Sequence, residues 1–127
     1  MISDDSATLS DLKDSVQDFI KERDWSKYHN PKDLAISISI EAAELLELFQ
    51  WLKNGDISKE LKKHNLMDRI KEELSDILIY SISLSNVLNL DLSEAIIQKI
   101  DSNRIKYPVE KIKGRYSKYP QISRENT

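Results

Sequence analysis

Two short acidic motifs interrupt the most apolar segments of the chain, and they constrain its fold more than any other feature. The motifs are Glu41–Glu44 (EAAE) and Glu73–Asp76 (ELSD). In each motif the two carboxylates are three residues apart, so on a helix they lie on the same face. A carboxylate within a buried apolar stripe is unfavourable unless it is paired or bound to metal. Because no basic residue is an obvious partner, the four carboxylates predict a divalent-cation site.

Each motif continues a stripe of apolar residues with helical spacings of three and four. Glu41 takes one place in the first stripe, and Glu73 takes one place in the second. The apolar positions are Leu34, Ile38, Leu45, Leu48 and Leu52 in the first segment, and Leu66, Ile70, Ile77, Tyr80 and Leu84 in the second. Two facing helices would therefore each contribute two carboxylates.

The composition favours an all-α protein. Only two glycines and three prolines occur in 127 residues, and 32% of the residues are charged, which is typical of a helical domain. The alternation in residues 36–40 is compatible with a strand, but its continuity with the acidic motif favours helix. We expect one domain over residues 1–127, with a core at about 10–108 and a basic tail at 109–127.

Helix boundaries follow from periodicity and from local stop signals. Thr8 or Ser10 is a suitable cap for the first helix, and Asp91 for the last. Residues 23–31 are expected to form a loop, residues 56–64 a short helix or a linker, and the chain beyond Pro108 an irregular segment. The expected helices span residues 10–22, 32–52, 66–88 and 91–106, and Asn54-Gly55 marks the end of the second.

The charge is distributed unevenly. Residues 1–97 carry 11 basic and 19 acidic side chains, whereas residues 98–124 carry eight basic and two acidic ones. The basic segment is either a solvated tail or a site for an anion whose other end lies at the acidic cluster. A polyphosphate would satisfy the second alternative.

Several other classes of protein are disfavoured. A di-iron carboxylate bundle needs Glu-x-x-His pairs, but Ser26 and Leu61 stand three residues before the two histidines. A buried polar cluster without metal remains an alternative.

The chain has no cysteine, no secretory signal pattern at its start, and no apolar run long enough to cross a bilayer, so we expect a cytoplasmic protein. Residues 77–90 are apolar nearly all round, which predicts self-association.

Aromatic residues extend the two acidic stripes. Trp51 lies seven residues after Glu44, Tyr80 lies four after Asp76, and Trp25 and His29 precede the second expected helix. A tryptophan at helical spacing is usually a core residue, but bases also stack on aromatic rings. A pocket with metal ligands at one end and aromatic rings at the other is typical of a nucleotide-binding site.

The segments EAAELLELFQW and EELSDILIY resemble the MazG-like, all-α nucleoside triphosphate pyrophosphohydrolases, whose signature is ExxE, a spacer and ExxD. RDWSKYHNPKDLA and KIDSNRIKYPVEKIKGRYSKY are similar to segments of the dCTP pyrophosphatase-like branch of this family. The resemblance covers residues 12–119. One departure is the long spacer of 28 residues between Glu44 and Glu73.

The resemblance implies a four-helix bundle that works as a homodimer or a dimer of dimers, with no nucleic acid polymer or membrane as partner. It implies Mg²⁺-dependent hydrolysis of a (deoxy)nucleoside triphosphate to the monophosphate and pyrophosphate, with Mn²⁺ as a possible substitute for Mg²⁺. The implied substrate is dCTP or another dNTP, and the implied role is nucleotide-pool housecleaning. A non-catalytic metal- or nucleotide-binding module is the alternative. The implied metal-binding and catalytic residues are Glu41, Glu44, Glu73 and Asp76; those for the nucleoside are Trp25, His29, Trp51 and Tyr80; those for the phosphates are Lys99 and Asn103.

Overall fold

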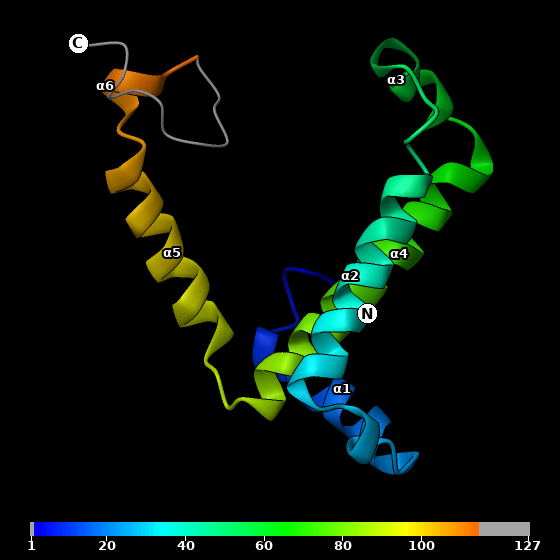
Figure 1. The fold of residues 1–127 in the computed structure, drawn as a ribbon, viewed down its shortest axis with the longest axis vertical. Helices are drawn as coiled ribbons and strands as arrows, with labels where there is room; N and C mark the ends of the chain where they lie inside the picture. Colours follow the sequence, from blue (N-terminus) through cyan, green and yellow to red (C-terminus); the bar gives the residue numbers. More distant parts are fainter. Residues whose placement is uncertain (1, 115–127) are drawn as a thin grey trace. The chain divides into compact units, whose positions relative to one another are not determined.

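All regular structure in the described part of the chain is helical. The computed structural model describes residues 2–114, which contain no strand, so the expected all-α class is confirmed. Figure 1 shows the elements in chain order. They are α1 (Leu9–Glu22), the 3₁₀ turn η1 (Ser26–Tyr28), α2 (Pro31–Glu47), the 3₁₀ turn η2 (Asn54–Asp56), α3 (Ile57–Glu60), α4 (His64–Val87), α5 (Leu92–Lys106) and α6 (Val109–Ile112). None of these helices is both long enough and apolar enough to span a membrane.

The chain divides into two compact units, residues 1–90 and residues 91–127. The first unit contains α1 to α4 and both acidic motifs, and the described part of the second contains α5 and α6. The division of the chain into a core and a basic tail within one domain stays a prediction, and residues 115–127 of that tail lie outside the described residues.

Side-chain caps begin the first and the fifth helix. The Asp11 amide donates to Thr8 Oγ1 at 3.1 Å, and the Thr8 amide donates back to Asp11 Oδ2 at 2.8 Å. This reciprocal pair is a capping box, which satisfies two amides that the first turn leaves free. The structure therefore selects Thr8, not Ser10, as the cap. Asp91 caps α5 as expected, accepting from the Glu94 amide at 2.9 Å.

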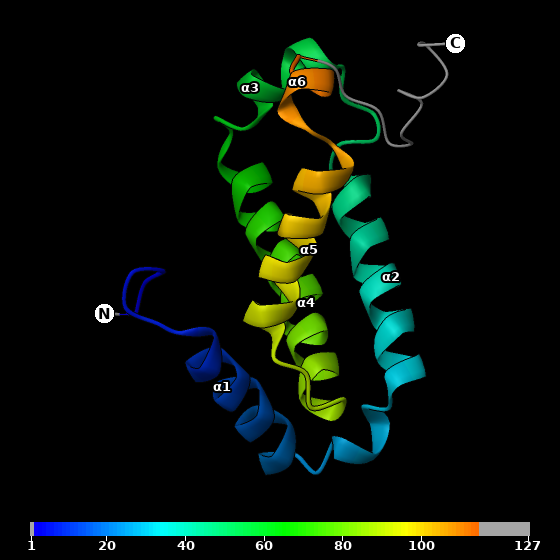
Figure 2. The ribbon, with the colours of Figure 1, turned by 90° about the vertical axis from the view of Figure 1, so that its left-hand side faces the viewer.

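The core of the first unit lies between α2 and α4. The two helices lie side by side and run in opposite directions, as Figure 2 shows. Their predicted stripes are half-buried or buried, with Leu34 only 1% exposed. α1 packs against the C-terminal part of α4, where Asn86 Nδ2 donates to the Lys13 carbonyl at 3.0 Å and Lys13 Nζ donates to the Leu90 carbonyl at 2.6 Å.

The predicted C-terminus of the second helix is wrong, because α2 ends at Glu47 instead of continuing to residue 52. Beyond it the amides of Leu48, Phe49 and Leu52 each donate to a carbonyl three residues earlier, which forms tight turns in place of α-helix. Asn54-Gly55 lies within η2 and is not the end of α2. Trp51 is therefore outside the helix, and helical spacing does not place it on the Glu44 face.

Two other segments are more regular than a loop. Residues 56–64 contain the short helix α3, one of the two alternatives, and the expected loop at residues 23–31 contains η1. The expectation of an irregular segment beyond Pro108 is wrong for residues 109–112, because α6 follows this proline directly. Residues 115–127 lie outside the described residues.

The cap at Thr8 provides a test of the first helix. Replacing Thr8 with Ala removes the acceptor for the Asp11 amide, so we expect the free energy of unfolding to fall by about 0.5–2 kcal/mol in denaturant titrations. Ser10→Ala is the matched control, because Ser10 is exposed and lies inside α1. An equal or larger loss in Ser10→Ala would contradict the assignment.

Candidate metal and nucleotide site

The antiparallel pairing of α2 and α4 brings three of the predicted carboxylates together. Glu41 comes from α2, whereas Glu73 and Asp76 come from successive turns of α4. One oxygen from each of the three lies within 4.8 Å of the others, and all three residues are half-buried. Two helices that share an apolar core thus hold a compact set of oxygen donors.

This cluster lacks internal partners. Oε2 of Glu41 and Oε2 of Glu73 are buried, and neither has a hydrogen-bond partner among the described residues. Buried carboxylate oxygens without a partner are strongly unfavourable. Hard divalent cations such as Mg²⁺ prefer carboxylate oxygens, so the three residues fit such an ion in donor type and in spacing.

The electrostatics also indicate that the cluster lacks a positive charge. Burial raises the pKa of Glu41 to about 7, and the neighbouring Glu44, Glu73 and Asp76 contribute in the same direction. The neighbouring Glu41 carboxyl lowers the pKa of Glu73, but burial and the nearby Glu44 and Asp76 outweigh this effect and leave that pKa raised. A cation would reverse both shifts by favouring the ionised carboxylates.

Glu44, the fourth predicted ligand, lies beside the cluster. It is exposed and is not one of the three residues whose oxygens gather within 4.8 Å. Glu44 still contributes to the raised pKa of both Glu41 and Glu73.

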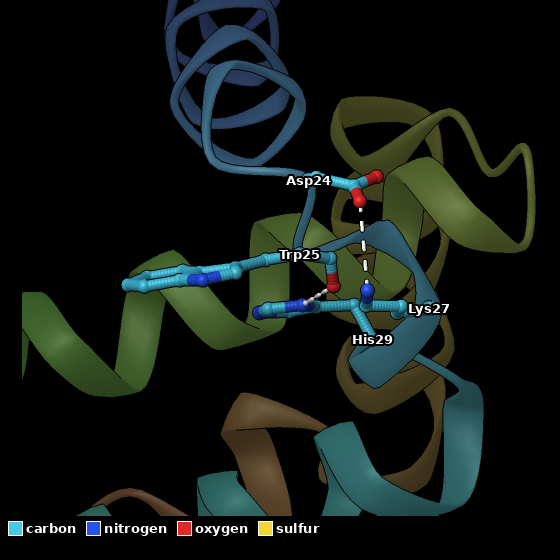
Figure 3. Close-up of polar contacts among 4 residues, drawn as sticks. All are labelled: Asp24, Trp25, Lys27 and His29. Atoms are coloured by element: carbon cyan, nitrogen blue, oxygen red, sulfur yellow. Dashed lines mark hydrogen bonds and ion pairs between the residues drawn. The ribbon is translucent and has the colours of Figure 1, made fainter.

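The loop before α2 brings His29 to the aromatic residue that follows the acidic motif on α4. The imidazole of His29 stacks on the ring of Tyr80, with centroids 6.5 Å apart and an angle of 22° between the planes. Nδ1 of His29 lies 2.7 Å from the Trp25 carbonyl oxygen, and the other ring nitrogen points away from this bond (Figure 3). Trp25 packs edge-on against Phe19 at 5.8 Å and keeps 43% of its surface exposed.

The remaining predicted residues lie on other segments, in the turns after α2 and on α5. Trp51 is 86% exposed in the turns after α2. Lys99 and Asn103 are four residues apart on α5, so they lie on one face of that helix. They belong to the second unit, which is described by itself.

The sequence pattern did not single out Ser83 and Asn86, which line a cavity next to His29. The available signal was the presence of small polar residues in the otherwise apolar second half of α4. Three serines occur there at alternate positions, Ser81, Ser83 and Ser85, and Asn86 follows them.

A divalent cation should stabilise the protein through this cluster. We expect Mg²⁺ at 100 times its dissociation constant to add about 2.7 kcal/mol, which is visible as a higher melting temperature. Glu73→Gln should lose this response and, in EDTA, melt at least as high as the wild type because repulsion is relieved. Glu47→Gln, at an exposed position on α2, is the control. A full Mg²⁺ response in Glu73→Gln would contradict the site.

Comparisons with known proteins agree with this arrangement. The MazG-like family model matches residues 36–122. The chain is 37% identical to dCTP pyrophosphatase 1 of Rattus norvegicus over 117 residues, which is 92% of this chain and 69% of the rat protein. It is 35% identical to dCTP pyrophosphatase 1 of Homo sapiens, over 91% of this chain and 68% of the human protein.

A solved structure is similar as well. The crystal structure of a pyrophosphatase from Archaeoglobus fulgidus superposes with a TM-score of 0.73 at 40% identity, covering 85% of this chain and 99% of the archaeal one. The family match extends over more than half of the chain and includes both acidic motifs. The chain therefore belongs to the MazG-like family.

Proposed function

We propose that this protein is a nucleoside triphosphate pyrophosphohydrolase, which converts a (deoxy)nucleoside triphosphate into the monophosphate and pyrophosphate. The observation that carries the proposal is the cluster of Glu41, Glu73 and Asp76, with two buried oxygens that lack partners. Hydrolysis of a polyphosphate is the chemistry of the similar dCTP pyrophosphatases and of the archaeal pyrophosphatase.

We assign the ligands of a divalent cation, Mg²⁺ with Mn²⁺ as a substitute, to Glu41, Glu44, Glu73 and Asp76. When bound, the cation neutralises phosphate charge and makes the phosphorus more susceptible to attack by water. By holding the cation, these carboxylates would fix the position of the triphosphate relative to α2 and α4. The raised pKa values of Glu41 and Glu73 mean that protons compete with the cation for these two carboxylates.

Aromatic residues form the proposed nucleoside site. Tyr80 is one helical turn beyond Asp76, and its contact with His29 supplies a ring surface next to the carboxylates. Trp25 holds His29 in place through its carbonyl group, and the exposed ring of Trp51 is free to cover the ligand. Cationic and amide groups on one face of α5, Lys99 and Asn103, are suited to the phosphates of the substrate.

The names of the similar proteins support dCTP, or another dNTP, as the preferred substrate. The role that we propose is removal of unwanted nucleotides from the pool. We also propose the four-helix bundle, with α1, α2, α4 and α5 as its helices, and an assembly of two or four copies.

Apolar surface on the single chain supports this assembly. Ile36 and Ile40 on α2 are 47% and 52% exposed, and Leu78 on α4 is 52% exposed. Ile36 and Ile40 also line an open groove of about 480 Å³ on α2. Contiguous apolar surface of this kind indicates a protein contact, and an identical copy presents the matching surface.

The products identify the bond that is broken. We expect dCTP and Mg²⁺ to give dCMP and pyrophosphate, and hydrolysis in oxygen-18 water to place the label in dCMP, because water attacks the α-phosphorus. Glu41→Gln should lower kcat by about a hundredfold or more, because it removes a proposed ligand of the cation that stabilises the phosphate charge. Glu47→Gln should leave kcat unchanged. Release of orthophosphate with dCDP would overturn the proposal.

The mass in solution tests the assembly. Light scattering at micromolar concentration should give at least twice the 14.8 kDa of one chain. A monomer under these conditions would show that the exposed faces of α2 and α4 are covered in another way.

A further inference from the structure

Two residues other than glycine adopt the left-handed backbone conformation in the described part of the chain. They are Asp24, with a φ of 55°, and Asn89, with a φ of 57°. L-amino acids disfavour this conformation because it brings Cβ too close to a carbonyl oxygen, although aspartate and asparagine tolerate it better than most residues. Each of the two therefore occupies a position where the fold requires an unusual turn.

Asp24 closes α1 with a Schellman motif. Its amide donates to the Lys21 carbonyl at 3.0 Å, and the amide of Trp25 donates to the Ile20 carbonyl at 3.0 Å. These two bonds define the motif, and glycine is the residue most often found at its left-handed position. The conformation of Asp24 thus sets the direction in which the chain leaves α1, and Trp25 is the first residue after the turn.

The same motif ends α4. The amide of Asn89 donates to the Asn86 carbonyl at 3.2 Å, and the amide of Leu90 donates to the Ser85 carbonyl at 2.9 Å. Asn89 therefore has the backbone conformation of Asp24 but is followed by an aliphatic residue instead of an aromatic one. This makes the end of α4 a matched control for the end of α1.

The residue after Asp24 holds His29. A carbonyl oxygen only accepts, so Nδ1 of His29 donates to the Trp25 carbonyl across 2.7 Å (Figure 3). A neutral imidazole carries one proton, so this bond selects the Nδ1–H tautomer. The same ring stacks on Tyr80, which is one helical turn beyond Asp76. The Trp25 carbonyl thus fixes both the tautomer and the place of the His29 ring.

The carboxylate of Asp24 contributes little to this arrangement. Among the described residues its ion pair is with Lys27, across 3.5 Å, and the Asp24 side chain is 90% exposed. Exposed ion pairs stabilise a fold only slightly. The backbone conformation of Asp24, and not its charge, is therefore the property that we expect to matter.

We propose that Asp24 is a positioning residue for the proposed nucleoside site. Its left-handed conformation directs the Trp25 carbonyl towards His29, and the resulting bond holds the His29 ring against Tyr80. This inference rests on the proposed function and adds a residue that acts through the backbone without contacting the substrate. Residues in unfavourable backbone conformations persist where the surrounding structure enforces them, and they gather at ligand sites.

The tautomer of His29 tests the proposal without any substrate. In alkaline solution the ¹⁵N and ¹H signals of the His29 ring, identified by their loss in His29→Gln, should place the proton of the wild-type protein on Nδ1. Asp24→Ala should shift the ring towards the Nε2–H form, because alanine lacks the short polar side chain that makes the left-handed conformation tolerable. Asp24→Gly and Asp24→Asn should keep the wild-type tautomer, since both residues adopt that conformation readily.

Kinetics test the role in the nucleoside site. Asp24→Ala should raise KM for dCTP by about fivefold or more, since a misplaced His29 ring loses part of one stacking contact. The kcat should change by less than about twofold, because the lost contact belongs to binding and not to the chemical step. Asp24→Gly and Asp24→Asn should retain the wild-type KM. Asn89→Ala should lower the melting temperature as Asp24→Ala does, but leave KM unchanged.

An Nε2–H tautomer of His29 in the wild type would overturn the proposal without any variant, because it excludes the bond to the Trp25 carbonyl. An unchanged KM in folded Asp24→Ala, or an equal rise of KM in Asn89→Ala, would show that the turn has only a structural role. Should Asp24→Ala not fold, Asp24→Ser takes its place, because the serine hydroxyl can bond locally and makes the turn less unfavourable.

Equilibrium binding of dCMP with Mg²⁺ separates this proposal from the enzymatic function. Turnover of dCTP, with dCMP binding and KM unaffected by Asp24→Ala, would leave the hydrolase in place and remove the positioning role. Weaker dCMP binding in Asp24→Ala, without turnover of dCTP by the wild type, would retain the positioning role and refute the hydrolase.

Discussion

The packing of α2 against α4 is the interaction on which the rest of the first unit depends. It buries Leu34 and, through the same contact, places Glu41 opposite Glu73 and Asp76. The apolar contacts favour the pair of helices, whereas burial, together with repulsion from the neighbouring carboxylates, raises the pKa of Glu41 to about 7. A bound cation would remove this conflict, so the proposed cation binding and the stability of the helix pair would be thermodynamically linked.

Much of this arrangement could be predicted from periodicity. The apolar stripes at spacings of three and four identified α2 and α4, and the interrupting carboxylates identified the cluster before any geometry was known. The end of α2 could not be predicted in the same way. Residues 45–52 keep helical spacing, yet the chain turns after Glu47 because hydrogen bonds to carbonyls three residues earlier replace the α-helical ones. Local pattern does not distinguish these two hydrogen-bond schemes, so helical spacing does not give the position of Trp51 relative to Glu44.

The sequence pattern also does not show which surface covers each apolar face of a helix. On α2, Leu34 and Ile38 are covered by the chain itself, whereas Ile36 and Ile40 are about half exposed, although all four are apolar. The sequence predicts that the helix is apolar on two sides and leaves open which side meets its own chain. Lys99 and Asn103 illustrate a related limit, because their spacing on α5 is clear from the sequence but their distance from the acidic motifs depends on tertiary packing.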